Sequence, residues 1–166
     1  TLIRFNSKNE INGQIQDAFA GRATLEGAGQ PGTITFSKPD VEDIDLEAGT
    51  IFPTEHYVHL IEAARAGQER LSRSVYDGSG PEGIFDTLAV LSALESEDGE
   101  HELLNGLESW RVRLAFYAPG DEAVLPEYEV GFRLYRNGVA SEVSLDYGDF
   151  RLEAVLSRLE FTDSGC

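Results

Sequence analysis

The chain has 166 residues, with 13 basic and 30 acidic side chains that give a formal charge of −17 and a pI near 4.4. This length predicts a single domain over residues 1–166. The acidity excludes non-specific nucleic-acid binding, because phosphate contacts need Lys and Arg, and it disfavours electrostatic docking on anionic lipid. No apolar run approaches the roughly 20 residues that cross a bilayer, so no transmembrane segment is expected.

Short alternating segments in the first 50 residues predict β-strands. Residues 2–8 alternate weakly, and residues 10–27 hold one strand that breaks near Gly13 and a second that starts near residue 18. Residues 32–38 follow the turn signal GAGQPG and alternate clearly between apolar residues and threonines. The acidic stretch 40–49 is expected to form a loop with a short edge segment.

A single prominent helix is expected at about 54–66, in the sequence TEHYVHLIEAARA. Thr54 is the expected N-cap, because its hydroxyl can accept a free backbone N–H. Gly67 fits a left-handed C-cap. The spacing of Val58 and Ile61 predicts that both turn inward, so that the helix plugs or braces an open curve of the sheet.

The rest of the chain is expected to be mostly strands. Residues 70–78 and 84–94 predict two strands, and a polar loop follows at 95–106. Four alternating segments complete the pattern: 109–118, 127–136, 142–147 and 150–156. The pair Asn137–Gly138 is a strong hairpin signal. These segments predict a four-strand antiparallel meander with one apolar and one charged face, in a mainly β fold whose sheet curls, closes or packs on the helix.

The two histidines of the helix raise the question of a metal site. His56 and His59 are three residues apart, so both imidazoles could share one face. They lack the HExxH spacing of zinc proteases, and the only cysteine is Cys166, far away in the sequence. No metal site is therefore predicted. His56 is expected to serve the start of the helix or to make a local hydrogen bond, and His59 is expected to face solvent or to pack.

Three aspartates in Gly-containing turns are candidate catalytic residues: Asp77, Asp146 and Asp149. Asp77 lies in the Gly-rich stretch VYDGSGPEG, which lacks the lysine of a phosphate loop and the spacing of a nucleophile elbow. Asp146 and Asp149 flank a tight reversal, in which Asp and Gly are favoured. Turn chemistry explains all three aspartates, so no catalytic residue and no cofactor is predicted. A hydrolase that joins one of these carboxylates to His56 stays open as a distant alternative.

Five features in order resemble the EipB family of cell-envelope integrity proteins from Gram-negative alphaproteobacteria. They are IFPTEHYVHLIEAARAG (51–67), VYDGSG (75–80), LPEYEVGFRLYRNGV (125–139), SLDYGDFRLEAVLSRLEF (144–161) and Cys166. The resemblance implies a periplasmic protein with a curled antiparallel sheet, called a β-spiral, which is similar in shape to lipoprotein carriers. It implies no enzymatic activity. It also implies that this chain is the C-terminal part of a longer protein and that Cys166 pairs with an upstream cysteine outside it.

Two functions follow from the resemblance and the residues together. The first is a non-enzymatic periplasmic protein that supports the cell envelope by binding an envelope protein or an apolar envelope component. The alternative is a carrier for a lipid, an acyl chain or a lipoprotein, with an apolar cavity inside the curled sheet. Its lining would comprise Trp110, Phe116, Tyr128, Phe132 and Leu134. A filled core at these five positions stays open, as does self-association through an exposed sheet edge.

Overall fold

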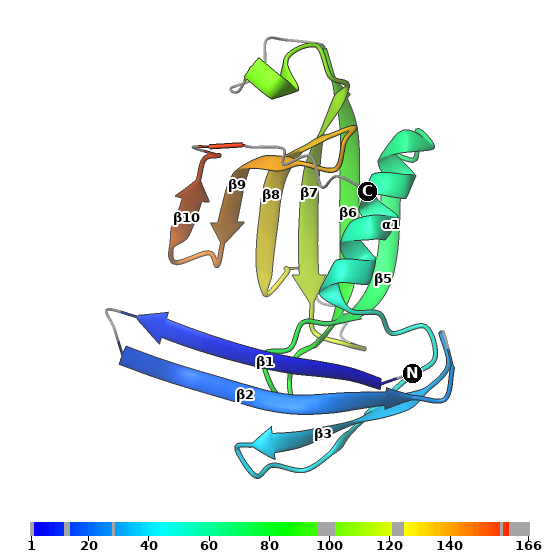
Figure 1. Ribbon diagram of the computed structural model, residues 1–166, viewed down its shortest axis with the longest axis vertical. Helices are drawn as coiled ribbons and strands as arrows, with labels where there is room; N and C mark the ends of the chain where they lie inside the picture. The colour runs from blue at the N-terminus through cyan, green and yellow to red at the C-terminus, as the bar shows by residue number, and fades with distance from the viewer. Residues whose placement is uncertain are drawn as a thin grey trace, which may run out of the picture. The chain divides into compact units, whose positions relative to one another are not determined.

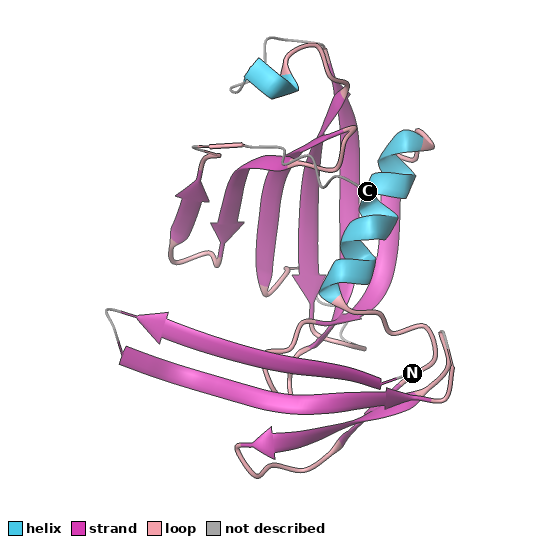
Figure 2. Cartoon of the chain, viewed as in Figure 1, coloured by secondary structure: helices cyan, strands magenta, loops and turns pink. Residues whose placement is uncertain are grey.

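The computed structural model describes residues 2–11, 14–27, 29–95, 102–120, 125–156 and 158–159. These residues form a mainly β fold of two antiparallel sheets and one α-helix, as the sequence predicts (Figures 1 and 2). The chain divides into two compact units, and each is described by itself. The first comprises residues 1–57, 73–87 and 118–121, and the second comprises residues 58–72, 88–117 and 122–166.

The first sheet is four-stranded, in the order β1-β2-β3-β4. Its strands are β1 (Leu2–Ile11), β2 (Gln14–Leu25), β3 (Gly32–Lys38) and β4 (Ile44–Leu46). The prediction for residues 32–38 is confirmed at both ends, and β4 is the short segment expected within the acidic stretch. Register shifts occur near Asn9 in β1 and near Ala20 in β2, where the regular pairing is interrupted.

The core of the first unit is apolar and rich in aromatic rings. Its buried members are Ala23, Ile34, Phe36, Leu46 and Tyr76. Phe5 packs edge-to-face on both Phe36 and Tyr76, with ring centroids 5.9 and 5.6 Å apart. Edge-to-face contact suits rings whose faces carry partial negative charge and whose edges carry partial positive charge.

The helix, α1 (Pro53–Arg65), begins one residue earlier than predicted. Pro53 occupies the first helical position, where its missing N–H costs no hydrogen bond. The His56 N–H donates to the Phe52 carbonyl at 2.8 Å, so Thr54 lies inside the first turn and is not the N-cap. The C-cap is as predicted: Gly67 has φ 70°, and the Gln68 N–H donates to the Ala63 carbonyl at 2.9 Å.

The inward face of α1 also differs from the prediction. The buried positions are His56, Leu60, Ala63 and Ala64. They follow the i, i+4, i+7, i+8 spacing of a helical stripe. Val58 is 46% exposed, so its predicted inward orientation is wrong, while Ile61 is half-buried. Near the end of the helix, the Arg65 guanidinium donates to the Arg136 carbonyl at 2.6 Å, which fixes this turn to the hairpin at residues 135–139.

The second sheet is six-stranded, in the order β10-β9-β8-β7-β6-β5. Its strands are β5 (Arg70–Tyr76), β6 (Ile84–Leu94), β7 (Ser109–Tyr117), β8 (Tyr128–Tyr135), β9 (Ala140–Asp146) and β10 (Arg151–Ala154). The predicted four-strand meander is β7 to β10. A short 3₁₀ turn, η1 (Glu102–Leu104), lies in the segment predicted as a polar loop.

The Asn137–Gly138 hairpin joins β8 to β9 as the sequence predicts. Gly138 has φ 84°, a conformation that L side chains rarely adopt, and its N–H donates to the Tyr135 carbonyl at 2.8 Å. The Asn137 side chain accepts the Val139 N–H at 3.1 Å. A bulge follows in β9, because Gly131 pairs with Ser144 while Arg133 pairs with Ser141.

Candidate binding surfaces on the β7–β10 meander

The structure places the five predicted lining residues on one face of the meander. Trp110 pairs with Leu134 across β7 and β8, and Phe116 pairs with Tyr128. Leu134, Phe116 and Phe132 are buried, whereas Trp110 and Tyr128 are half-buried. The five side chains therefore share an apolar face, and whether they line a ligand cavity stays a prediction.

Two of these residues begin a row of aromatic rings that reaches the surface, called here the aromatic row. The Phe116 and Tyr128 rings stack at 4.2 Å, Tyr128 and Tyr147 follow at 5.4 Å, and Tyr147 stacks on Phe150 at 4.9 Å. The exposed fraction rises from 7% at Phe116 to 53% at Phe150. The row thus leads from a buried position to the loop between β9 and β10.

Exposed apolar side chains lie along β9 and β10, in the turn between them and just after β10. We call this set the apolar strip: Val143, Tyr147, Phe150, Leu152 and Val155, with exposed fractions between 36% and 66%. All four residues of β10 are exposed, and β10 is the edge strand of the sheet. An edge strand offers backbone donors and acceptors to a further strand. The strip and the edge together form a surface suited to an extended apolar chain.

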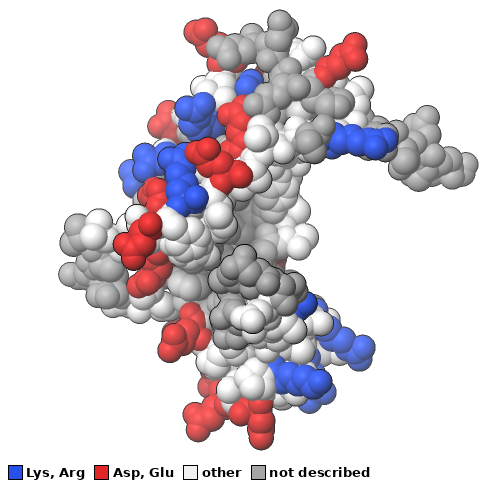
Figure 3. All heavy atoms as spheres, turned by 90° about the vertical axis from the view of Figure 1, so that its left-hand side faces the viewer, with Lys and Arg blue, Asp and Glu red and all other residues white. Residues whose placement is uncertain are grey.

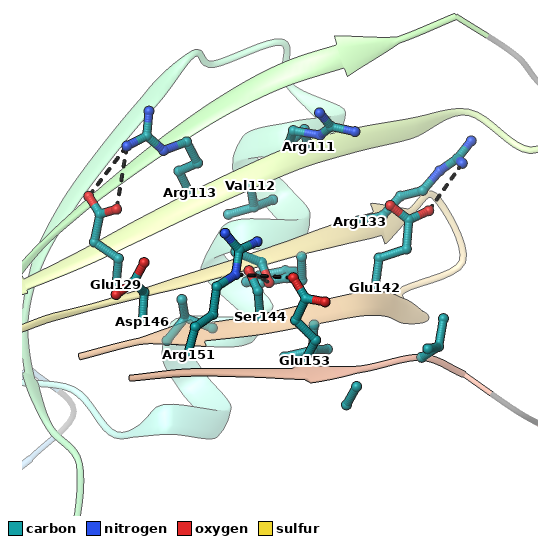
Figure 4. Close-up of a pocket in the computed structure, with 16 residues that line it drawn as sticks. Arg111, Val112, Arg113, Glu129, Arg133, Glu142, Ser144, Asp146, Arg151 and Glu153 are labelled. Carbon is teal, nitrogen blue, oxygen red and sulfur yellow. Dashed lines mark hydrogen bonds and ion pairs between the residues drawn. The ribbon is translucent and has the colours of Figure 1, made fainter. Parts of the chain in front are cut away.

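The opposite face of the meander is charged and holds an open hollow of about 610 Å³, called here the charged hollow (Figure 4). In this figure α1 passes behind the sheet, away from the labelled charged side chains. The floor of the hollow includes Gly131 and Ser144, which are paired across β8 and β9. A Cβ at position 131 would lie 2.7 Å from the Ser144 hydroxyl oxygen, so the absent side chain keeps the floor low.

Ion pairs connect several side chains around the charged hollow. Arg113 lies 3.4 Å from Glu129, and Arg151 lies 3.1 Å from Glu153. These two pairs are exposed, and such pairs contribute little to stability. Arg133 is different, because its side chain is 9% exposed while it lies 3.5 Å from Glu142. In the upper left of Figure 3 acidic and basic side chains lie beside one another.

Glu142 has a backbone conformation that is rare for its residue type. Its φ is 51°, in the left-handed region, where side chains other than Asn, Asp and Gly are uncommon. It lies in the β9 bulge, where two residues of β9 oppose a single residue of β8. The bulge brings the Glu142 carboxylate to Arg133, so the pairing irregularity and the ion pair have a common origin.

The two histidines of α1 differ in their surroundings. His56 is buried with Nε2 3.4 Å from the Thr87 hydroxyl, and that hydroxyl donates to the Arg73 carbonyl at 2.9 Å. His59 Nδ1 is buried with no hydrogen-bond partner in the part of the chain that the structure describes. Over that same part, no group of three or more His, Cys, Asp or Glu side chains has the arrangement of a metal site.

Asp77 and Asp146 both act in turns, as predicted. Asp77 Oδ1 accepts the Ser79 N–H at 2.8 Å, and Asp146 Oδ1 accepts the Gly148 N–H at 2.8 Å. Asp149 is exposed in the same turn as Gly148. Cys166, the cysteine for which a disulfide partner outside this chain is predicted, lies outside the described residues.

Tyr76, in the core of the first unit, has a raised pKa. Burial, and then the negative charge of Asp77, raise the pKa of Tyr76 to about 12. The nearby Gly80 backbone lowers the pKa and so offsets part of this increase. The contact is weak, because the tyrosine hydroxyl makes no hydrogen bond of good geometry to a described residue. A phenol with a raised pKa stays neutral at physiological pH, so this side chain acts as part of the core.

The described residues thus form a β-rich fold of two antiparallel sheets, with the apolar strip and the charged hollow on its meander. No helix within the described ranges is both long and apolar enough to cross a membrane. The sequence model of the EipB-like family matches residues 1–163. The chain therefore belongs to the EipB-like family, which confirms the resemblance seen in the sequence.

A curated relative and a solved structure agree with this assignment. The cell envelope integrity protein EipB of Brucella abortus (strain 2308) is 30% identical over 169 residues, which cover 98% of this chain and 59% of the relative. This chain thus spans about three fifths of that relative's length. The crystal structure of a β-barrel-like protein of a domain of unknown function, also from Brucella abortus, matches with a TM-score of 0.81 and 28% identity. That match covers 98% of this chain and 68% of the other.

Proposed function

We propose that this chain is part of a non-enzymatic periplasmic protein that supports the cell envelope by binding an extended apolar segment of an envelope protein. Membership of the EipB-like family and the name of the Brucella relative support the link to the envelope. The apolar strip beside the edge strand β10 is the observation that carries the binding role.

The chemistry of the strip favours a polypeptide strand as the occupant. In β10 the exposed Leu152 lies between Arg151 and Glu153, so apolar and charged side chains alternate along an exposed edge. A partner strand would pair with the β10 backbone and place its own alternate apolar residues beside Leu152. Main-chain hydrogen bonds supply affinity in such an arrangement, and side-chain contacts supply selectivity.

The experiment places a photoreactive phenylalanine analogue at position 152 of the full-length protein in cells. A matched control carries the analogue at Leu125, which is 77% exposed and lies outside the strip. We expect a protein adduct from position 152, recovered in the periplasmic fraction, and none from position 125. A lipid adduct, or no adduct above that of the control, contradicts the strand-binding proposal.

A phenotype supplies the second arm. The double variant Phe150→Thr/Leu152→Thr keeps strand-forming residues while it removes large apolar groups from the strip. We expect cells with this variant to lose resistance to bile-salt detergents, and cells with Leu125→Thr to keep it. Normal resistance in cells that hold normal amounts of the folded double variant would overturn the proposal.

The carrier alternative rests on a separate observation, the half-burial of Trp110 and Tyr128 on the apolar face. An acyl chain held there would contact both rings. Native mass spectrometry after mild extraction, with Phe132→Glu as the comparison, tests this alternative. Bound lipid that Phe132→Glu abolishes supports a carrier, and protein that is free of lipid in repeated preparations contradicts it.

A further inference from the structure

The charged hollow has two ends of opposite character, and two residues of the apolar strip, Val143 and Val155, also contribute to its lining. Arg111 and Arg133 are directly paired across β7 and β8, and Glu129 and Asp146 are directly paired across β8 and β9. Figure 4 shows the two arginines at one end of the hollow and the two carboxylates at the other, with Ser144 between them. The hollow therefore presents a positive and a negative end across a neutral floor.

At the positive end, the guanidinium group of Arg111 has no acidic partner in the described part of the chain. The Arg111 side chain is exposed and makes no hydrogen bond or ion pair to any described residue, whereas the Arg133 side chain is paired with Glu142. Like charges directly opposite each other in a sheet destabilise it. An anionic group between the two guanidinium groups would relieve this repulsion and could accept two donors from each.

At the negative end, a carboxylate has no ion-pair partner among the residues that the structure describes. Glu129 and Asp146 face each other, and Glu129 has Arg113 as its ion-pair partner. Asp146 uses Oδ1 for the Gly148 N–H, which leaves its second oxygen for a ligand. Arg151, which is directly paired with Asp146 across β9 and β10, has Glu153 as its ion-pair partner at 3.1 Å. The two guanidinium groups at this end are thus paired with Glu129 and Glu153, which leaves the Asp146 carboxylate for a ligand cation.

The separation of the two ends determines the length of a ligand. Positions 129 and 133 are four residues apart on β8, which corresponds to about 13 Å along a strand at roughly 3.3 Å per residue. An extended peptide of four residues spans about 13–14 Å. The hollow of about 610 Å³ lies within the volume range of small-ligand sites.

We propose that the charged hollow binds a short peptide of about four residues by its free ends, with the terminal carboxylate at Arg111 and Arg133 and the terminal ammonium at Glu129 and Asp146. This inference goes beyond the proposed function, because it concerns the charged face and a soluble ligand. Inorganic phosphate would occupy the arginine end alone. A zwitterionic lipid headgroup, whose two charges lie only a few bonds apart, is too short to reach both ends.

The test is an NMR titration of the ¹⁵N-labelled chain with tetraalanine. We expect the largest shifts at the amides of Gly131 and Ser144 on the floor of the hollow. N-acetyl-tetraalanine and tetraalanine amide each lack one terminal charge, and each is expected to bind about threefold more weakly or worse, the size of effect that a partly exposed ion pair gives. Dialanine is too short to reach both ends of the hollow, so its affinity is expected to be lower than that of tetraalanine by a similar factor.

Two variants assign the ends. Arg111→Gln removes a side chain that no described residue uses, and Asp146→Asn keeps an oxygen for the Gly148 N–H while it removes the charge. With Arg111→Gln, the affinity gap between tetraalanine and its amide should narrow, because Arg133 remains at that end. With Asp146→Asn, the affinity gap between tetraalanine and its N-acetyl form should narrow. The control Arg70→Gln removes an exposed arginine outside the hollow and should change neither comparison.

Several outcomes would overturn the proposal. They are no shifts at the floor amides with tetraalanine, equal binding of all four peptides, and an effect of Arg70→Gln as large as that of Arg111→Gln. Tighter binding of phosphate or glycerophosphoethanolamine than of tetraalanine would assign the hollow to a compact anion or a headgroup instead.

Discussion

The core of the first unit and the meander of the second use aromatic residues in different ways. In the core, Phe5, Phe36 and Tyr76 come from three strands, and the ring planes of the contacting pairs cross at 84° and 69°. In the meander, the rings of the aromatic row come from neighbouring strand positions and a turn. Phe116 stacks on Tyr128 at 13°, and Tyr147 stacks on Phe150 at 19°. Rings that converge from several strands meet edge-on and close a core, whereas rings on one sheet face lie parallel and leave an open end.

The largest expected difference between the two regions lies in the cost of removing a ring. Phe36→Ala should lower the free energy of unfolding by about 3–5 kcal/mol, because Phe36 is 7% exposed and contacts two other rings. Phe150→Ala should cost about 0.5 kcal/mol, because this ring is 53% exposed. Urea unfolding followed by circular dichroism measures both. Equal costs would mean that the two aromatic regions do not differ as described.

The ionisation of Tyr76 at high pH gives a second difference between the buried core of the first unit and the exposed rings of the meander. Its pKa is raised to about 12 in the folded chain, so the protein prefers the neutral phenol more strongly than the unfolded chain does. The stability from this preference is fully present below about pH 10 and is lost as the pH rises toward 12. Between pH 10 and pH 12 the wild-type chain should therefore lose roughly 2 kcal/mol of unfolding free energy through this group, and Tyr76→Phe should not show this loss.

Urea midpoints of the wild-type chain and Tyr76→Phe at pH 8, 10 and 12 measure this effect. The two proteins should differ little at pH 8, since the tyrosine hydroxyl makes no hydrogen bond of good geometry to a described residue. Tyr147→Phe is the control from the meander, because that ring is 44% exposed. A difference between wild type and Tyr76→Phe that stays constant from pH 8 to pH 12 would show that burial does not shift this tyrosine.

The smallest expected effect concerns two arginines of the meander. Arg133→Gln should cost about 1–2 kcal/mol, because Arg133 is buried, donates to Ser109 at 3.2 Å and lies over the Tyr135 ring at 5.0 Å. Arg136→Gln should cost below about 0.5 kcal/mol although its ion pair with Glu108 is shorter, at 2.6 Å, because both side chains are more than 60% exposed. Thermal unfolding of both variants measures the two stability losses. A larger loss for Arg136→Gln than for Arg133→Gln would contradict the view that burial, rather than distance, determines the contribution.

Much of the fold follows from local patterns in the sequence. Strand β3 was predicted to the residue because a turn signal precedes it and its alternation is regular. The Asn137–Gly138 hairpin and the Gly67 C-cap depend on glycine at positive φ, which is a local property. The start of α1 was missed by one residue because Pro53 was interpreted as preceding the helix, whereas proline is favoured at the first helical position.

The inward face of α1 could not be predicted from hydrophobicity alone. Val58 and Ile61 are large and apolar, but the buried stripe begins at His56 and continues through Leu60. The first buried position of the stripe is a histidine. Hydrophobic periodicity does not count histidine as a buried residue, so the pattern does not show where the stripe begins. The partner that makes burial acceptable, the Thr87 hydroxyl, is 31 residues away in the sequence.

The charged hollow depends on register, which one strand alone does not determine. Alternation predicted a charged face for the meander, and this is correct. It did not show that Arg111 faces Arg133, or that Gly131 lies in the floor between the two charged ends, because these facts require the pairing of β7, β8 and β9. The aromatic row was missed in part for the same reason, since Tyr147 and Phe150 join it through a turn.

The β9 bulge also affects how the length of this strand can vary among relatives. The extra residue at Glu142 separates two paired segments, one toward Ala140 and one toward Asp146. A relative that lacks this residue can restore plain alternation while Ser141 and Ser144 keep their faces, because only the unpaired position is lost. Alignments of related chains should therefore place a one-residue gap at this position more readily than at any other point in β8 or β9.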